Sequence, residues 1–221
     1  MTANEPSELQ RIYGLRFDQK RAYRTRVWQV LVVEKFQSYV RPGATVLDLG
    51  CGYGEFINQI RCGKKYAMDL NPGARQHLAP EVELLEQDCS THWPLAEGSL
   101  DVVFTSNFFE HLPSKAALKA TLEEAHRCLK PGGALIAMGP NVRYLAGSYW
   151  DFWDHHLALT DLSMAEGLEN CGFRVAEKVA RFLPYTMVKQ REVPPAFISA
   201  YLRLPLVWPV FGRQFLIVAE K

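Results

Sequence analysis

The chain has 221 residues, of which 48% are hydrophobic and 22% are charged, and its formal net charge is +1. This length and composition predict one folded domain with a single core. The near-neutral charge argues against a nucleic acid partner, because phosphate backbones are bound by strongly basic surfaces. The five cysteines are widely spaced, which disfavours a zinc site or a disulfide framework and favours a cytoplasmic location.

The predicted elements alternate between helices and strands along the chain. Residues 19–40 carry apolar side chains at helical spacing and are followed by Pro42 and Gly43, which predicts an N-terminal helix. The predicted strands are 45–49, 66–70, 82–86, 100–105, 134–138, 173–180 and 214–220. The later predicted helices are 55–61, 73–78, 115–129 and 162–171. This alternation predicts an α/β fold with a doubly wound, mostly parallel seven-stranded sheet flanked by helices.

The predicted domain, residues 1–221, has four parts. These are an N-terminal helical segment (1–42), a cofactor-binding core (43–181), a C-terminal lid-like insertion (182–213) and a closing strand (214–221). The insertion contains the apolar run 194–211, in which four prolines and Arg203 argue against a membrane-spanning helix. Two roles stay open for this run: a lid packed over the active site, or contact with a membrane-borne or lipid-linked substrate.

Three glycines and one acid follow the first two predicted strands. In a doubly wound sheet the ligand lies beyond the carboxyl ends of the strands, so functional residues are expected there. Gly50, Gly52 and Gly54 follow the first strand, and a loop without side chains lets backbone N–H groups approach a ligand. Asp69 closes the second strand, where a carboxylate can accept hydrogen bonds from both ribose hydroxyls.

The third and fourth predicted strands end in further polar residues. Asp88 and Cys89 follow the third strand, and a carboxylate there can accept a hydrogen bond from the exocyclic amine of adenine. Asn107 follows the fourth strand and can face the centre of the cofactor. Surface turns and helix caps would explain each feature singly, but the four agree in order and spacing, which predicts an adenosine-type cofactor.

The ordered motifs of residues 40–140 resemble those of the class I S-adenosylmethionine-dependent methyltransferases. They are VLDLGCGYG at 46–54, Asp69, QD at 87–88, LDVV at 100–103, FEHL at 109–112 and LKPGG at 129–133. The resemblance implies a seven-strand Rossmann-like fold and S-adenosylmethionine as cofactor. It also implies that Gly50, Gly52 and Gly54 hold the methionine portion, Asp69 the ribose and Asp88 the adenine. Asp48 resembles the acidic residue that lies near the methionine ammonium group.

The connection after the fifth strand carries the candidate catalytic residues. Methyl transfer requires an aligned nucleophile and exclusion of water, and a hydroxyl acceptor also requires a base. His155 and His156 end the sequence WDFWDHH at 150–156, whose aromatic residues could stack on a sugar and whose Asp151 or Asp154 could orient an imidazole. A loop packed only for stability is the alternative. His111 belongs to the FEHL motif and is assigned a structural role.

A metal ion is not predicted. The four residues Asp151, Asp154, His155 and His156 include suitable ligand types, but no second, separated ligand group is evident. Arg16, Lys20 and Arg24 recur at helical spacing, which is typical of a solvated helix face and also suits recognition of an acidic or phosphate-bearing acceptor.

The leading interpretation is an O- or N-methyltransferase for a small molecule. The sequence NFFE at 107–110 departs from the signature of amino-methylating nucleic acid enzymes. Residues 154–161 and 208–215 resemble methyltransferases of bacterial saccharide and glycolipid assembly, which makes a sugar hydroxyl the first acceptor to test. The alternatives are a non-catalytic cofactor-binding partner subunit and a nicotinamide-dependent oxidoreductase. The sequence leaves the oligomeric state open and allows a homodimer.

Overall fold

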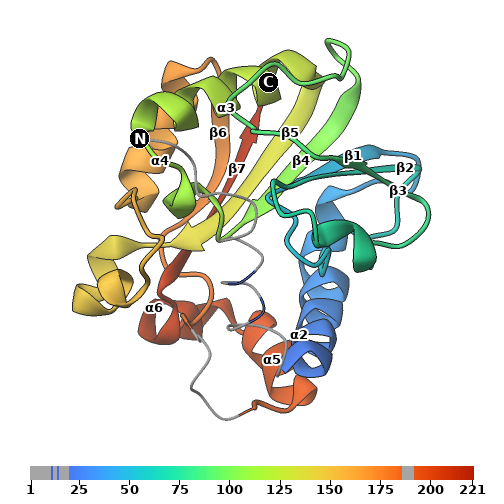
Figure 1. The fold of residues 1–221 in the computed structure, drawn as a ribbon. Helices are drawn as coiled ribbons and strands as arrows, with labels where there is room; N and C mark the ends of the chain where they lie inside the picture. Colours follow the sequence, from blue (N-terminus) through green and yellow to red (C-terminus); the bar gives the residue numbers. More distant parts are fainter. Residues whose placement is uncertain (1–10, 12–13, 15–19, 186–191) are drawn as a thin grey trace.

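The computed structural model describes residues 11, 14, 20–185 and 192–221, and its centre is a seven-stranded sheet (Figure 1). The strands are β1 (Thr45–Leu49), β2 (Lys64–Met68), β3 (Val82–Leu85), β4 (Leu100–Ser106), β5 (Leu129–Pro140), β6 (Arg174–Val179) and β7 (Gln214–Glu220). Their order is β3-β2-β1-β4-β5-β7-β6, and β7 alone runs antiparallel to its neighbours. The predicted doubly wound, mostly parallel sheet is confirmed. The strand order reverses between β1 and β4, the place where such sheets bind ligands.

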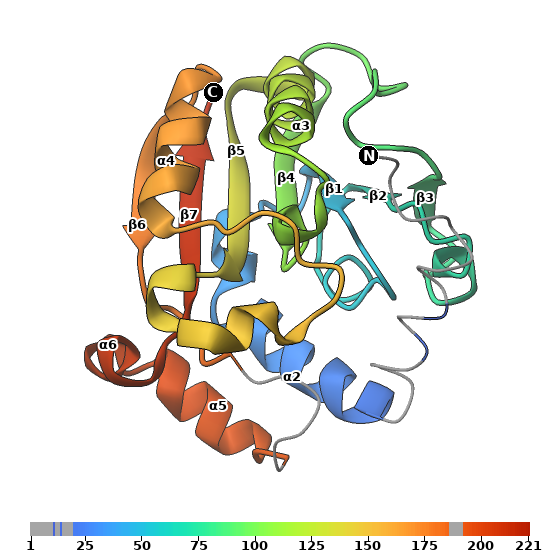
Figure 2. The ribbon, with the colours of Figure 1, turned by 60° about the vertical axis from the view of Figure 1, so that its left-hand side comes forward.

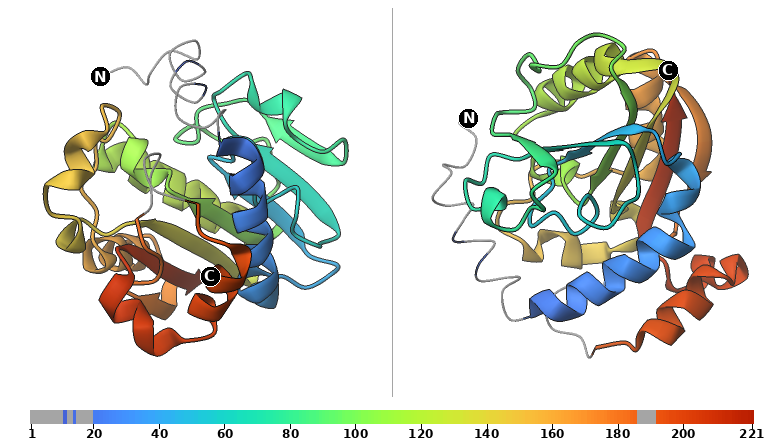
Figure 3. Two further views of the ribbon diagram at one scale, coloured as in Figure 1. Left: turned by 90° about the horizontal axis from the view of Figure 1, so that it is seen from below. Right: turned by 90° about the vertical axis from the view of Figure 1, so that its right-hand side faces the viewer.

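Helices cover both faces of the sheet (Figure 2). Helices α3 (Lys115–Cys128) and α4 (Asp161–Asn170) pack on one face, where Leu47 and Leu49 of β1 point. Helix α2 (Arg21–Glu34) lies on the other face with Val46, and α5 (Pro195–Leu202) runs beside it (Figure 3). Because successive strand residues point to opposite faces, Asp48 points to the same side as Val46. The strand alternation therefore directs this acid toward the α2 side.

Three of the predicted helices differ from the structure. The N-terminal helix ends at Glu34 and continues as a short 3-10 helix, η2 (Phe36–Tyr39), instead of running to residue 40. The prediction of a helix at 55–61 is wrong, because this segment forms turns, and 73–78 contains only the 3-10 helix η3 (Ala74–Gln76). The side chain of Asn58 donates to the carbonyl of His77 and accepts from the N–H of Ala79, both at 2.9 Å. A side chain of the first segment therefore satisfies backbone hydrogen-bonding groups of the second.

The apolar run 194–211 folds into three short helices, α5, η7 (Pro205–Val207) and α6 (Trp208–Phe211). Each has a proline in its first turn, where the missing N–H removes no helical hydrogen bond. Within the described part of the chain, no helix has the length and apolarity required to cross a membrane. The prolines therefore divide the run as the sequence predicts.

We expect Phe36→Ala to lower the free energy of unfolding by about 3–5 kcal/mol, because it leaves a cavity in a closed aromatic cluster. The Phe36 ring is fully buried and lies 5.0 Å from the Phe104 ring and 6.2 Å from the Trp28 ring. Denaturant unfolding measures the effect. Val33→Ala on the same N-terminal segment is the control, since Val33 is 68% exposed and its loss should change stability by less than about 0.5 kcal/mol. Equal losses in the two variants would contradict this packing role.

Candidate cofactor and acceptor cavity

A cavity of about 510 Å³ opens beside the carboxyl ends of β1 and β4. It collects residues that are far apart in the sequence, including all but one of those predicted for the cofactor and both candidate catalytic histidines. These residues are Asp48, Gly50, Gly52, Asp69, Asp88, Cys89, Asn107, His155 and His156. Gly54, later in the same loop, does not line the cavity, and an added Cβ there would meet Leu78 at 2.5 Å. The cavity thus unites the predicted cofactor residues with the segment after β5.

The glycines of the loop after β1 are required by its backbone conformation. Gly50, Gly52 and Gly54 have φ angles of +68°, +54° and +73°, in the left-handed region that residues with a Cβ rarely adopt. A Cβ at Gly50 would also lie 2.2 Å from the ring of Phe108. The sequence indicated close approach to a ligand, and the structure adds that the chain could not turn this way with larger residues.

Asp69 holds this loop through backbone hydrogen bonds. Its Oδ2 accepts from the N–H of Gly52 at 2.7 Å and its Oδ1 accepts from the N–H of Asn71 at 2.8 Å. Burial raises the pKa of Asp69 to about 6, although both backbone bonds act in the opposite direction. Each carboxylate oxygen has a further lone pair, so the group can still accept hydrogen bonds from two hydroxyls.

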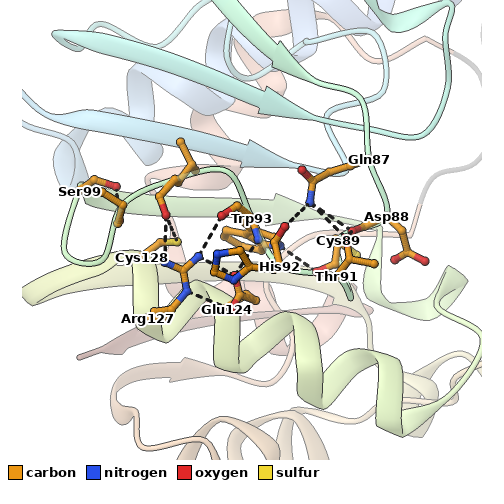
Figure 4. Close-up of polar contacts among 12 residues, drawn as sticks. Gln87, Asp88, Cys89, Thr91, His92, Trp93, Ser99, Glu124, Arg127 and Cys128 are labelled. Atoms are coloured by element: carbon orange, nitrogen blue, oxygen red, sulfur yellow. Dashed lines mark hydrogen bonds and ion pairs between the residues drawn. The ribbon is translucent and has the colours of Figure 1, made fainter.

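The loop after β3 is anchored to α3 (Figure 4). The indole N–H of Trp93 donates to the carbonyl of Cys89 at 2.8 Å, and the backbone N–H of Trp93 donates to Glu124 of α3 at 2.8 Å. Arg127 also bonds Glu124, at 2.6 Å. The carboxylate of Asp88 points away from this cluster in Figure 4 and lines the cavity. A rigid support thus presents Asp88 and Cys89 to the cavity.

Two more polar groups face the cavity from β1 and β4. Asp48 is 3% exposed, and burial, with the nearby negative charge of Glu55, raises its pKa well above the ordinary range. Asn107 has a φ of +50°, and its Oδ1 is buried with no hydrogen-bond partner among the residues that the structure describes. A buried carboxylate and an unsatisfied amide oxygen both favour a ligand that brings positive charge and N–H or O–H donors.

The far wall of the cavity is apolar and comes from α2 and α5. The side chains that form it are Val27, Trp28 and Leu31 of α2 and Phe197, Ile198 and Tyr201 of α5. Glu34 joins the two helices, because it accepts hydrogen bonds from Ser199 at 2.7 Å and from Arg203 at 2.7 and 2.9 Å. The hydroxyl of Tyr201 donates to the carbonyl of Phe182 at 2.6 Å. These hydrogen bonds hold α5 of the C-terminal segment in place as one wall of the cavity.

A further polar cluster lies where the 3-10 helix η4 (Phe109–His111) meets the segment after β5. The backbone N–H groups of His156 and Leu157 donate to the carbonyl of Glu110 at 2.8 and 3.0 Å. The Nδ1 of His111 donates to the backbone carbonyl of Asp154 at 3.0 Å and lies 3.2 Å from its carboxylate. Asp154, one of the two aspartates that the sequence offered for orienting His155 or His156, contacts His111, to which the sequence assigned a structural role.

Comparisons with known proteins agree with this geometry. A family model described as a methyltransferase domain matches residues 47–137, which run from β1 into β5 and include the glycine loop, Asp69, Asp88 and Asn107. Residues 47–137 are thus similar to a methyltransferase domain, on a fold shared with solved S-adenosylmethionine-dependent methyltransferases. S-adenosylmethionine is the cofactor that this likeness implies. The cavity fits it, because the unsatisfied Asn107 oxygen and the buried acids match its cationic amine and its hydroxyl groups.

Named relatives are similar to part of this chain. It is 35% identical over 128 residues to malonyl-[acyl-carrier protein] O-methyltransferase of Dechloromonas aromatica, covering 55% of this chain and 47% of that protein. It is 28% identical over 153 residues to 2-methyl-6-phytyl-1,4-hydroquinone methyltransferase of Synechocystis, covering 59% and 46%. The chain thus spans about half the length of these relatives.

A solved structure extends the likeness in fold. The SAM-dependent methyltransferase from Archaeoglobus fulgidus aligns with a TM-score of 0.65 at 21% identity, over 89% of this chain and 94% of that chain. The alignment reaches well beyond the residues that the family model matches. The likeness in fold therefore also extends outside the cofactor core.

Two of the aromatic residues that the sequence offered for stacking on a ligand, Trp150 and Trp153, lie away from the cavity. Trp150 and Trp153 are 59% and 86% exposed and do not line it, so they are not placed to stack on a ligand there. Lys20 and Arg24 do line it, and Arg24 forms an ion pair with Glu55 at 2.7 Å. Arg16 lies outside the described residues.

Glu110 was not predicted from the sequence, although its position after the fourth strand was a signal for it.

The charge on Glu110 and His111 is set by their burial and by each other. Burial raises the pKa of Glu110 to about 7, although the adjacent His111 acts in the opposite direction. Burial lowers the pKa of His111, but the hydrogen bond to Asp154 and the charge of Glu110 outweigh this effect and raise it. The Glu110 carboxyl therefore exchanges its proton near neutral pH, and the raised pKa of His111 keeps its imidazole protonated to a higher pH than usual.

The affinity of the protein for the cofactor should fall as the pH drops through about 6, because protonation of Asp69 competes with the hydroxyl groups that bond its ionised form. Calorimetry with S-adenosylhomocysteine between pH 5 and about 8 measures this. Asp69→Asn should weaken binding by about 1.5–3 kcal/mol and remove the fall in affinity at low pH. Asp88→Asn is the matched control, which should weaken binding and keep this fall. A fall in affinity at low pH that persists in Asp69→Asn would contradict the assignment.

Proposed function

We propose that this methyltransferase transfers a methyl group from S-adenosylmethionine to an oxygen, or alternatively a nitrogen, of a small lipid-linked acceptor, with a saccharide precursor as the first class to test. One observation carries the proposal: a single cavity has acidic cofactor residues on one side and an apolar wall from α2 and α5 on the other. We assign Asp48, Gly50, Gly52 and Gly54 to the methionine portion. Asp69 is assigned to the ribose, Asp88 and Cys89 to the adenine, and Asn107 to the cofactor centre.

The bound cofactor supplies a methyl group made electrophilic by its positive sulfonium. The chain's own contribution is to hold the acceptor in line and to exclude water, and alignment of this kind contributes about 7–11 kcal/mol to lowering a barrier. For a hydroxyl acceptor, a base must take the proton. We assign this to His156, which is exposed and lines the cavity. His155 lines the same cavity but is 6% exposed, and we assign it to orienting the acceptor.

The acceptor side of the cavity supports a molecule with both an apolar part and a polar group. Beside the apolar wall lies Gln214, which is 7% exposed and whose Oε1 is buried without a hydrogen-bond partner in the described part of the structure. Such an oxygen accepts a hydrogen bond from a ligand hydroxyl or amine. The Synechocystis relative is named for a phytyl-bearing hydroquinone, an acceptor that also combines hydroxyl groups with an apolar tail.

The outer surface of the C-terminal segment supports access from a membrane. Its exposed apolar side chains are Val193, Phe197, Leu204, Leu206, Val210 and Phe211. Phe197 is 67% exposed and also lines the cavity, so the apolar surface continues into the cavity wall. Residues 193–213 contain two arginines and no acidic residue, which suits an anionic lipid surface. We assign this surface to contact with the membrane that carries the acceptor.

With an acceptor found from a panel of lipid-linked and free saccharides, His156→Ala should lower kcat by about 10²–10⁴ and leave cofactor affinity nearly unchanged, because only the proton transfer is lost. Transfer of a labelled methyl group measures kcat. Trp153→Ala is the control, since Trp153 is exposed nearby and does not line the cavity. Near-normal kcat in His156→Ala would rule out His156 as the base. The absence of transfer to every acceptor in the panel would rule out lipid-linked and free saccharides as the acceptor class.

Leu206→Glu should reduce binding of the protein to vesicles of phosphatidylglycerol and phosphatidylcholine several-fold, because it places a negative charge where the exposed apolar surface meets the lipid. Leu206 is 91% exposed, so the substitution leaves the core intact. Co-sedimentation measures the bound fraction. Leu162→Glu on α4 is the matched control, since Leu162 is 51% exposed and lies outside this segment. Equal binding by the two variants, or no binding by the unmodified protein, would contradict the membrane contact.

A further inference from the structure

Two imidazoles and one carboxylate meet beside the cofactor residues. They belong to Glu110, His111 and His155, and one potential ligand atom from each lies within 4.8 Å of the others. Glu110 and His155 are buried, at 3% and 6% exposed, and the rings of His111 and His155 lie 4.9 Å apart at a steep angle. No metal is predicted from the sequence, because the group forms only where η4 meets the segment after β5.

The hydrogen bonds of both histidines fix the same tautomer. The Nδ1 of His111 lies 3.0 Å from the carbonyl oxygen of Asp154, and the Nδ1 of His155 lies 2.9 Å from the carbonyl oxygen of Tyr149. A carbonyl oxygen only accepts, so each Nδ1 donates, and in the neutral ring the lone pair is then on Nε2. A donor bond from the second ring nitrogen to a carbonyl or carboxylate is the support that metal-bound histidines ordinarily have.

The buried carboxylate of Glu110 requires positive charge nearby, and the adjacent His111 supplies it only when its imidazole is protonated. Among the residues that the structure describes, no lysine or arginine forms an ion pair with it. Buried carboxylates are ordinarily paired with a cation or bound to a metal ion. Beside two imidazoles that each carry a lone pair, a metal ion meets this requirement directly.

We propose that Glu110, His111 and His155 bind one divalent transition metal ion of the Zn²⁺ class, through a carboxylate oxygen and the two Nε2 atoms. Two nitrogens and one oxygen suit Zn²⁺ or Fe²⁺, whereas Mg²⁺ and Ca²⁺ favour oxygen ligands throughout. Ligand bonds to zinc are about 2.0–2.2 Å long, so side-chain rotations draw the three atoms inward when the ion binds.

The geometry also gives the metal an open side. His111 and His155 line the cavity and Glu110 lies behind them, so a fourth ligand position faces the space beside the cofactor residues. Three protein ligands with an open position are typical of zinc sites that act on a bound molecule. An oxygen of the acceptor would take this position, and this part of the inference rests on the proposed function.

Titration of the chelator-treated, full-length protein with Co²⁺ tests the site without any acceptor. We expect one equivalent to bind with visible ligand-field bands and excess Zn²⁺ to displace it, while Mg²⁺ leaves the bands unchanged. Glu110→Gln should abolish these bands, and Asp154→Asn, which alters the support of His111, should weaken Co²⁺ binding about 10–100-fold. Asp151→Asn is the control, because Asp151 is exposed outside the cluster, and should bind as the unmodified protein does.

Loss of folding in Glu110→Gln would leave that variant uninformative, so His111→Cys provides a second measurement. The thiolate replaces an imidazole on the half-buried side of the cluster, and Co²⁺ bound there should gain a sulfur charge-transfer band. The absence of a one-to-one Co²⁺ complex in the unmodified protein, or a His111→Cys complex without the new band, would overturn the proposal. Methyl transfer by a protein that binds no Co²⁺ or Zn²⁺ would overturn the metal site and leave the proposed function intact.

Discussion

Three buried carboxylates at the carboxyl end of the sheet impose the main physical constraint on this protein. Asp48, Asp69 and Glu110 are 3%, 8% and 3% exposed, and burial raises the pKa of each. Acids in such positions are stable only with compensating donors or cations. Backbone N–H groups of the glycine loop compensate Asp69, the adjacent His111 compensates Glu110, and we assign the same role to the ligands proposed for the cavity.

Asp69 shows how the compensation shapes the backbone. Its two oxygens accept from the N–H groups of Gly52 and Asn71, which holds the loop after β1 against the end of β2. The loop can follow this path only because its glycines adopt positive φ angles. The same carboxylate that is assigned to the cofactor therefore also forms the loop that receives it, and the binding site is organised before the cofactor arrives.

The apolar half of the cavity is built from the two ends of the chain. Helix α2 precedes the sheet and α5 follows most of it, yet the two lie side by side and are joined at Glu34 (Figure 3). Their side chains close the cofactor region on one side and leave Phe197 at the surface on the other. The segment that matches the methyltransferase domain is thus joined by an apolar wall, which we assign to the acceptor, from segments that the family model does not match.

The sequence by itself determined the sheet, the glycine loop and the acids at the strand ends, because these depend on local patterns: strand alternation, glycine conformation and the position of ligands in doubly wound sheets. Only the tertiary structure decided the absence of a regular helix at 55–61, where Asn58 bonds a neighbouring loop. It also decided the cluster of Glu110, His111 and His155. Two backbone hydrogen bonds to the Glu110 carbonyl bring together segments that are far apart in the sequence and share no local pattern.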